Sequence, residues 1–327
     1  LWIKKNGKIY KNKLGNLINL DDIPYQDWEI FDKRRIYKPM SGTIGRTGCF
    51  ELTRGCVFSC TFCINEFLNN VHNHKSYREK SIPKFIDEVK YFKDKYQIEY
   101  VYILAEMFLP TTKQRIRDFS RLWREKVDLP FWIQLRVEGV DEENARLLEE
   151  AGCVSISAGI ESGNEEFRKR VIHRMMSNQK IIDAFKILKK TKMQISGNSI
   201  IGFPGETREL IFDTIELNRK LELNNIMIHV FNPYRGTSLY DISVERGYIT
   251  PDHMAGDYRA DFTLNMPHIK KEEILGLQRT FALYVKFPRE MWHEIKIAEK
   301  FDEEGNKKFE ELSSIYKKQY FERSLMH

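Results

Sequence analysis

The sequence has no long apolar run. None of its apolar stretches, such as Ser-Ile-Ile-Gly at 199–202, approaches the roughly 20 residues that a membrane-spanning helix needs. It also shows no signal peptide, because Leu1-Trp-Ile-Lys-Lys lacks an apolar core followed by a small-residue cleavage site. We therefore expect a cytoplasmic protein without a membrane span.

The charge of the chain shows no strong excess of one sign. Its 327 residues are 42% hydrophobic and 31% charged, and the formal net charge is +6. This composition excludes disordered and collagen-like proteins and allows one large core or two modest ones. Because the basic residues are scattered among nearly as many acids, the sequence does not indicate nucleic-acid binding.

Hydrophobic periodicity predicts alternating strands and helices. The expected strands are Cys49–Thr53, Tyr100–Leu104, Phe131–Leu135, Val154–Ala158, Ile195–Ile201 and Ile226–Phe231. The expected helices between them are Ile82–Tyr96, Lys113–Lys126, Asp141–Ala151, Ser177–Thr191 and Glu206–Leu221. Strands joined by helix-length connections pair in parallel, so these units predict an α/β fold, a (β/α)6 partial TIM-type barrel with a C-terminal helical extension.

We expect three regions along the chain. Residues 1–42 read as a polar lead-in or linker, and residues 43–240 as the barrel. Residues 241–327 form a helical region, in which the amphipathic patterns are Lys270–Val285, Arg289–Lys300 and Asn306–Tyr320. Because the chain begins with a leucine rather than a methionine, we also expect a segment upstream of it.

The five cysteines do not suit a disulfide framework. Cys56, Cys60 and Cys63 crowd into eight residues directly after the first predicted strand, which indicates metal ligation in a reducing compartment. Three thiolates on one loop can bind three irons of a cubane and leave the fourth iron open. A structural zinc site needs four ligands, and no second Cys-x2-Cys pair is present, but zinc and buried thiols stay as alternatives. Cys49 and Cys153, each at a strand edge, are predicted to be buried thiols.

The segment Arg54-Gly-Cys-Val-Phe-Ser-Cys-Thr-Phe-Cys63 resembles the signature loop of the radical SAM superfamily. The resemblance implies that the three cysteines bind a [4Fe–4S] cluster whose open iron binds S-adenosyl-L-methionine (SAM). Reductive cleavage of SAM would then give a 5′-deoxyadenosyl radical that abstracts hydrogen from the substrate. An electron donor such as a flavodoxin or ferredoxin is implied as well. Phe62 is expected on the adenine side of SAM, with core packing as the alternative.

Further site residues are expected after the later strands, because parallel barrels place catalytic groups at the C-terminal ends of their strands. The resemblance implies SAM contacts for Glu106, after the second strand, with an exposed loop acid as the alternative. It implies the same for Glu161 and Ser162 in Gly-Ile-Glu-Ser-Gly, after the fourth strand. Glycines there allow close approach of the backbone, and a carboxylate and a hydroxyl can hydrogen-bond to SAM.

Two arginines are candidates for charge pairing in the same site. Arg136 ends the third strand, where an unpaired cation would be unfavourable to bury. We expect it to pair with Glu106, Glu161 or the SAM carboxylate. Arg174 lies where the superfamily often has a basic residue that meets that carboxylate.

The fifth strand ends in Gly202-Phe-Pro-Gly-Glu-Thr207. The turn that begins at Gly202 is predicted to contact the adenine end of SAM through its backbone. Glu206 and Thr207 are explained by capping of the next helix.

Several motifs together resemble the cobalamin-dependent branch of this superfamily, in which a cobalamin-binding domain precedes the core. They are the Leu20–Tyr25 lead-in, Gly-Ile-Glu-Ser-Gly, Gly-Phe-Pro-Gly-Glu-Thr and Tyr-Arg-Gly-Thr. The resemblance implies cobalamin as a further cofactor, bound by a domain that this chain lacks. It also implies methyl transfer to an unactivated carbon of a small-molecule, lipid or natural-product substrate. The alternatives are a cobalamin-independent radical SAM enzyme (rearrangement, cyclisation or C–C bond formation) and a non-catalytic metal-binding module.

Overall fold

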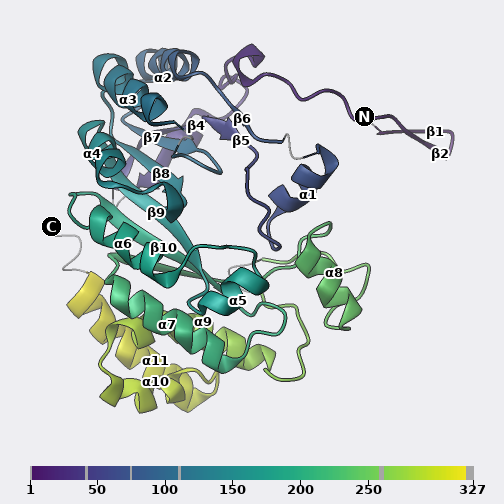
Figure 1. The fold of residues 1–327 in the computed structure, drawn as a ribbon. Helices are drawn as coiled ribbons and strands as arrows, with labels where there is room; N and C mark the ends of the chain where they lie inside the picture. The colour runs from purple at the N-terminus through teal and green to yellow at the C-terminus, as the bar shows by residue number, and fades with distance from the viewer. Residues whose placement is uncertain (1, 41–42, 74–75, 110–111, 258–260, 322–327) are drawn as a thin grey trace.

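A curved seven-stranded sheet forms the centre of the chain. The computed structural model describes residues 2–40, 43–73, 76–109, 112–257 and 261–321 (Figure 1). Neighbouring strands from β4 to β11 are parallel, and β3 is antiparallel to β4. In spatial order the strands are β11 (Asn225–Val230), β10 (Gln194–Ile201), β9 (Cys153–Glu161), β8 (Phe131–Leu135), β7 (Tyr100–Leu104), β4 (Thr43–Glu51) and β3 (Tyr37–Met40). All six predicted strands are present, so the predicted α/β partial barrel is confirmed.

Five helices connect the parallel strands and cover the outer face of the sheet (Figure 1). They are α2 (Ile82–Tyr96), α3 (Lys113–Leu122), α4 (Glu142–Glu150), α6 (Asn178–Leu188) and α7 (Arg208–Leu221). Four of them begin at a side chain that accepts a backbone N–H group, namely Ser81, Asp141, Ser177 and Thr207. The helix expected over 113–126 ends at Leu122 and continues as a π-helical turn, Trp123–Val127.

The core lies between this sheet and its helices. Val101 and Ile103 alternate along β7 with less buried residues and are fully buried, as expected for a strand with one face on the core. Trp123 packs edge-on against Phe131 with ring centroids 4.9 Å apart. Its indole N–H donates to the carbonyl of Leu129 at 2.9 Å, so the polar atom of this buried ring is satisfied.

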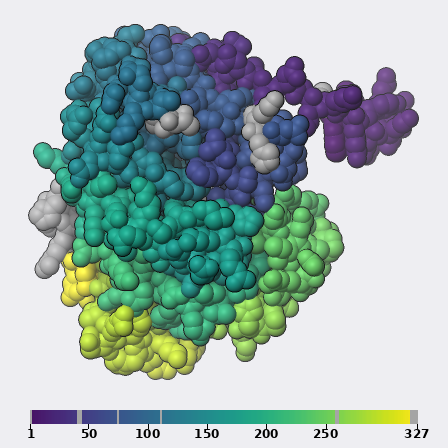
Figure 2. All heavy atoms as spheres, viewed as in Figure 1, coloured from purple at the N-terminus to yellow at the C-terminus, as the bar shows by residue number. Residues whose placement is uncertain are grey.

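The predicted lead-in contains regular structure that the sequence reading missed. The strands β1 (Trp2–Lys5) and β2 (Lys8–Lys11) form an antiparallel hairpin that projects from the body of the molecule (Figure 2). Its turn, Asn6-Gly7, has φ values of 50° and 76°, which are typical of a two-residue hairpin turn. The strand β3 also falls within residues 1–42, so the sheet begins inside the predicted lead-in. The division of the chain into three regions stays a prediction.

The rest of the lead-in attaches to the barrel through α2. Asp21 accepts the backbone N–H of Ser81 at 2.8 Å, at the start of this helix. Trp28 packs against Phe92 of α2 with ring centroids 4.3 Å apart and stacks on Phe50 of β4 at 5.8 Å.

Beyond the barrel the chain is helical, as predicted. The helices are α8 (Ser238–Glu245), α9 (Lys271–Lys286), α10 (Trp292–Ala298) and α11 (Glu303–Tyr316). Arg219 of α7 donates to the carbonyls of Tyr284, Val285 and Phe287 at 2.6, 3.0 and 2.7 Å, and thereby caps the C-terminal end of α9. Within the described ranges, none of the helices combines the length and apolar character required to cross a membrane.

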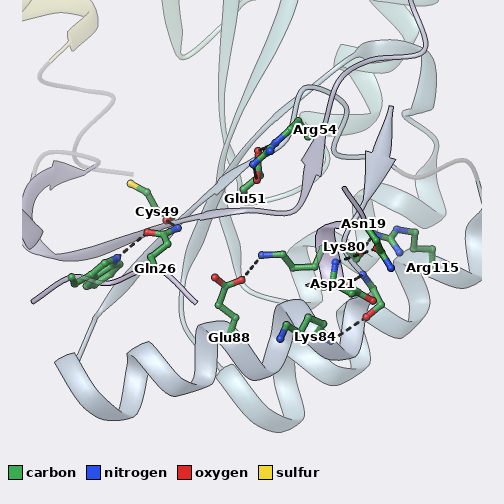
Figure 3. Close-up of polar contacts among 12 residues, drawn as sticks. Asn19, Asp21, Gln26, Cys49, Glu51, Arg54, Lys80, Lys84, Glu88 and Arg115 are labelled. Carbon is green, nitrogen blue, oxygen red and sulfur yellow. Dashed lines mark hydrogen bonds and ion pairs between the residues drawn. The ribbon is translucent and has the colours of Figure 1, made fainter. Parts of the chain in front are cut away.

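A buried ion pair joins α2 to the segment that enters it. Lys80 follows the short strand β6 (Arg78–Glu79), and its ammonium group faces the carboxylate of Glu88 on α2 (Figure 3). The two side chains are only 5% and 3% exposed. The backbone of Lys80 is also bound, because its N–H donates to Leu52 O at 2.9 Å and its carbonyl accepts from Arg115 at 2.6 Å.

Replacing one partner of this pair should destabilise the protein strongly. Lys80→Met leaves the Glu88 carboxylate buried without a cation, and we expect the free energy of unfolding to fall by about 3–5 kcal/mol in urea denaturation. The double variant Lys80→Met/Glu88→Leu removes both charges and should regain most of that loss. Lys90→Met, which breaks an exposed pair with Asp94, is the matched control and should change stability by less than about 1 kcal/mol. Equal effects of Lys80→Met and Lys90→Met would contradict the role assigned to burial.

Candidate functional site

A cavity of about 250 Å³ opens at the C-terminal ends of the parallel strands. Eight of the ten predicted site residues line it: Cys56, Cys60, Phe62, Cys63, Glu106, Arg136, Glu161 and Arg174. These residues come from the ends of β4, β7, β8 and β9 and from the loops after them. A larger hollow of about 600 Å³ lies between the lead-in and β4 and contains none of them.

The three clustered cysteines lie on residues 55–63, here called the cysteine segment. This segment runs from β5 (Thr53–Arg54) to α1 (Ile64–Val71), and Cys63 occupies the N-cap position of that helix. Cys56 and Cys60 are buried and Cys63 is half-buried. Burial raises the pKa of the Cys56 and Cys63 thiols. None of the cysteines forms a disulfide, so all three thiols of the segment are free to bind a metal.

Each of the three sulfur atoms accepts an N–H group from the protein. N–H groups directed at cysteine sulfurs stabilise thiolates and are a common feature of iron–sulfur sites. The donors are Phe58 N to Cys56 at 3.5 Å, Arg136 Nη1 to Cys60 at 3.3 Å, and Asn65 Nδ2 to Cys63 at 3.7 Å.

The path of the cysteine segment is fixed by buried polar contacts. Asn69 of α1 is 2% exposed, and its amide donates to the carbonyls of Cys56 and Phe58 at 3.0 and 3.1 Å. Gly55 has a φ of +79°, and a Cβ atom there would lie 2.4 Å from the carbonyl oxygen of Ser76. Only glycine fits this position without a shift of the backbone.

The helix α1 also connects the cysteine segment to the C-terminal part of the chain. The Glu66 carboxylate accepts the backbone N–H and the hydroxyl of Ser238 at 2.7 and 2.6 Å, at the start of α8. Leu239 N donates to Thr61 O at 3.1 Å. We name these contacts the Glu66 clasp. Glu66 and Ser238 are 172 positions apart in sequence.

Glu161 and Arg174 form a buried ion pair in the cavity wall. Their side chains are 11% and 4% exposed, and Arg174 Nη1 lies 2.6 Å from Glu161 Oε1. Arg174 Nη2 also donates to Gly159 O at 2.9 Å. Burial raises the pKa of Glu161, while Arg174 and then Arg136 oppose that shift. Glu161 has a φ of +65°, a strained conformation for a residue with a side chain, and such strain is concentrated at functional sites.

Arg136 has partners other than the glutamates that the sequence suggested. Neither Glu106 nor Glu161 pairs with it; its guanidinium binds Glu138, two residues further on, and contacts the Cys60 sulfur. The ring of Phe58 stacks on the guanidinium, 3.7 Å from centroid to carbon. Burial alone would raise the pKa of Glu138, but Arg136 lowers it below the usual range.

Glu106 and Phe62 both line the cavity and are both partly packed against the protein. Glu106 is exposed toward the cavity. Its partial burial nevertheless raises its pKa, while hydrogen bonds from its own backbone N–H and from that of Gly55 lower it. Phe62 lines the cavity and at the same time packs edge-on against Phe203, with centroids 5.7 Å apart. Cofactor contact and core packing are therefore compatible for Phe62.

The structure does not bring Ser162 and Gly202 to the cavity. Ser162 is fully buried behind Glu161. Gly202 has a φ of +84°, and a Cβ atom there would lie 2.6 Å from the ring of Phe262. Thr207 caps α7 as predicted, whereas Glu206 instead accepts the N–H groups of Gly202 and Phe203 at 2.6 and 3.1 Å.

The sequence reading missed several residues of the cavity wall. They are Phe58, Asn65, Gln134, Leu135, Ser157 and Asn198. Asn198 Nδ2 donates to Ser157 Oγ at 2.8 Å, which links β10 to β9. Polar residues at alternate positions of otherwise apolar strands were the available signal, because that alternation places them on the inner face.

Within the part of the chain that the structure describes, no three His, Cys, Asp or Glu side chains are grouped closely enough to hold one metal ion. A cubane does not require such a group, because each cysteine binds a different iron.

Comparison with known proteins identifies the family. The model described as the radical SAM superfamily matches residues 50–217, which is more than half of the chain. The chain belongs to the radical SAM superfamily. Its cofactors are therefore a [4Fe–4S] cluster and SAM.

Two curated relatives of this radical SAM protein are named as methyltransferases. An uncharacterized methyltransferase of Pyrococcus horikoshii is 28% identical over 288 residues, which cover 88% of this chain and 60% of the relative. Cytidylyl-2-hydroxyethylphosphonate methyltransferase of Streptomyces wedmorensis is 24% identical over 280 residues, which cover 80% of this chain and 51% of the relative. The chain thus spans about half the length of these relatives.

Solved structures share the fold at low sequence identity. The cobalamin-dependent SAM radical enzyme OxsB aligns with a TM-score of 0.65 and 14% identity, over 99% of this chain and 51% of that one. The radical SAM methyltransferase TsrM from Kitasatospora setae aligns with a TM-score of 0.51 and 17% identity, over 62% of this chain and 40% of that one.

The buried Glu206 predicts a pH dependence of stability. Burial raises its pKa to about 8, although hydrogen bonds from the N–H groups of Phe203 and Gly202 act in the opposite direction and lower it. The pKa is raised in the folded state, so the group contributes its full stability below the unfolded value of about 4.3 and loses it as the pH rises through about 8. We expect the free energy of unfolding of the apoprotein in urea to decline over this range in the wild type, but to decline less in Glu206→Gln.

Glu206→Gln should therefore be more stable than the wild type at high pH, by roughly 1.4 kcal/mol for each unit of pKa shift. Glu209→Gln, at an exposed carboxylate whose pKa is lowered by Thr207, is the control and should leave the decline in place. Parallel pH profiles of the wild type and Glu206→Gln would contradict the prediction.

Proposed function

We propose that this chain is the catalytic core of a cobalamin-dependent radical SAM methyltransferase that methylates an unactivated carbon. The observation that carries the proposal is the convergence of three free cysteines and a buried Glu161–Arg174 pair on one cavity, at the C-terminal end of the barrel strands. The names of the curated relatives support the methyl-transfer part.

In this proposal Cys56, Cys60 and Cys63 bind three irons of the cluster, and the fourth iron is left for SAM. The donor set fits, because all three sulfurs are thiols on one wall of the cavity and each accepts an N–H group. Burial raises the pKa of the Cys56 and Cys63 thiols and so disfavours their thiolate forms in the apoprotein. Binding of the cluster therefore releases protons.

The remaining cavity residues bind and orient SAM. When bound and reduced, the cluster supplies the electron that cleaves SAM to methionine and a 5′-deoxyadenosyl radical. The proposal assigns the SAM carboxylate to Arg174 and the amino group to Glu106, because both side chains line the cavity. An ammonium group beside Glu106 would favour its charged form and so offset the effect of burial on its pKa. Phe62 offers an apolar wall for the adenine.

The substrate in this proposal is a small molecule, and a reductant such as a flavodoxin or ferredoxin supplies the electron. Methyl transfer in this form consumes two SAM molecules for each product. One would give 5′-deoxyadenosine after hydrogen abstraction, and the other would give S-adenosylhomocysteine as the source of the methyl group that cobalamin would carry.

Anaerobic reconstitution of the full-length protein with iron and sulfide tests the cluster assignment. We expect a [4Fe–4S] EPR signal after reduction with dithionite, and formation of 5′-deoxyadenosine when SAM is added. Cys60→Ala should lose both, because it removes one of three iron ligands. Cys49→Ala, at a half-buried thiol outside the cavity, should keep both. Full 5′-deoxyadenosine formation by Cys60→Ala would show that the cluster is held elsewhere.

A separate measurement tests methyl transfer. With reduced cobalamin and SAM carrying a deuterated methyl group, the full-length protein should form S-adenosylhomocysteine and deuterated methylcobalamin. Formation of 5′-deoxyadenosine without S-adenosylhomocysteine would leave the radical SAM assignment standing and refute cobalamin-dependent methylation.

A further inference from the structure

Arg136 is held rigidly beside one of the clustered cysteines. Its side chain is 11% exposed and contacts three groups: the ring of Phe58, the carboxylate of Glu138 and the sulfur of Cys60. The distance from Arg136 Nη1 to Cys60 Sγ is 3.3 Å. Because an arginine stays protonated in proteins, a fixed positive charge lies at this sulfur.

Arg136 and Arg174 bind different carboxylates. Glu161, a carboxylate of the cavity wall, is bound by Arg174 at 2.6 Å, and Arg174 also binds the carbonyl of Gly159. The two arginines therefore have different surroundings: Arg174 pairs with Glu161, whereas Arg136 pairs with Glu138 and also contacts the Cys60 sulfur.

Arg136 differs from the N–H donors at the other two cysteines. Phe58 N and the Asn65 amide, which face Cys56 and Cys63, are neutral. A hydrogen bond from an ionised donor is roughly twice as strong as one between neutral groups. In a partly buried site, where the effective dielectric constant is low, the charge also acts over a longer distance.

We propose that Arg136 is a positioning residue that holds the Cys60 thiolate through a charge-assisted N–H···S hydrogen bond and raises the reduction potential of the [4Fe–4S] cluster. The inference rests on the cluster position in the proposed function. Reduction adds one electron whose charge is shared with the cysteine sulfurs, so a cation at Cys60 stabilises the reduced state more than the oxidised state. Hydrogen bonds to the sulfurs and nearby charge are established determinants of cluster potentials.

Glu138 provides an opposing charge on the same arginine. Its carboxylate binds the guanidinium, and its negative charge offsets part of the positive charge that the sulfur experiences. Glu138→Gln retains an oxygen that can accept from Arg136 but removes that negative charge. The inference therefore predicts shifts of opposite sign for variants of the two partners.

The test is an EPR-monitored redox titration of the reconstituted protein without SAM. For Arg136→Gln we expect the equilibrium to shift about tenfold toward the oxidised cluster, which is a midpoint potential lower by about 59 mV for one electron. Arg136→Lys keeps the charge but loses the planar stack on Phe58, and should shift less in the same direction. Glu138→Gln should shift the midpoint upward.

Arg208→Gln is the matched control. Like Arg136, Arg208 binds carboxylates, those of Glu299 and Glu273, and lies over an aromatic ring, that of Phe212. Unlike Arg136, it lies in the C-terminal part of the barrel. Its removal should leave the midpoint unchanged. Iron and sulfide contents of each variant establish that the clusters compared are complete.

The outcomes separate the inference from the proposed function. An unchanged midpoint in cluster-loaded Arg136→Gln, with or without a raised KM for SAM, overturns the inference alone. A downward shift or no shift in Glu138→Gln also overturns it, and this variant decides the question if Arg136→Gln fails to assemble a cluster. A wild-type protein that assembles no cluster would overturn the proposed function and this inference with it.

Discussion

Parallel pairing of the strands from β4 to β11 is the constraint on which the site depends. In a parallel sheet the carboxyl ends of all strands lie on one edge, so every loop that follows a strand opens there. Residues as far apart in sequence as Cys56 and Asn198 therefore line a single cavity. The helices on the outer face are the crossovers that this pairing requires, and their apolar sides form the core that keeps the register fixed.

The barrel was predicted well from the sequence because the spacing of its apolar residues reflects which side chains are buried. Strands such as β7 and β8 were placed to the residue, since each alternates core-facing and inner-face positions between two helices of regular period. The lead-in was harder, because the hairpin at Trp2–Lys11 buries neither face and so carries no such pattern. Its turn at Asn6-Gly7 was the one local signal.

The sequence predicted which residues lie near the cavity, but not which side chains they bind. Strand ends identify which loops reach the cavity, yet the choice of Glu138 rather than Glu161 for Arg136 depends on side-chain directions that spacing does not determine. Ser162 follows Glu161 directly, yet Glu161 lines the cavity while Ser162 is fully buried; the positive φ of Glu161 is a backbone feature that spacing does not predict. Gly202 faces Phe262, sixty residues later in the chain, a contact that no local pattern could indicate.

Through the Glu66 clasp, the cysteine segment connects the first strand of the barrel to the start of α8. One carboxylate holds both polar groups of Ser238, and the adjacent backbone contact runs from Leu239 to Thr61, only one residue after Cys60. The cysteines and the beginning of the C-terminal helices thus form one mechanical unit. The start of α8 is thus bound to positions one residue after Cys60 and three residues after Cys63.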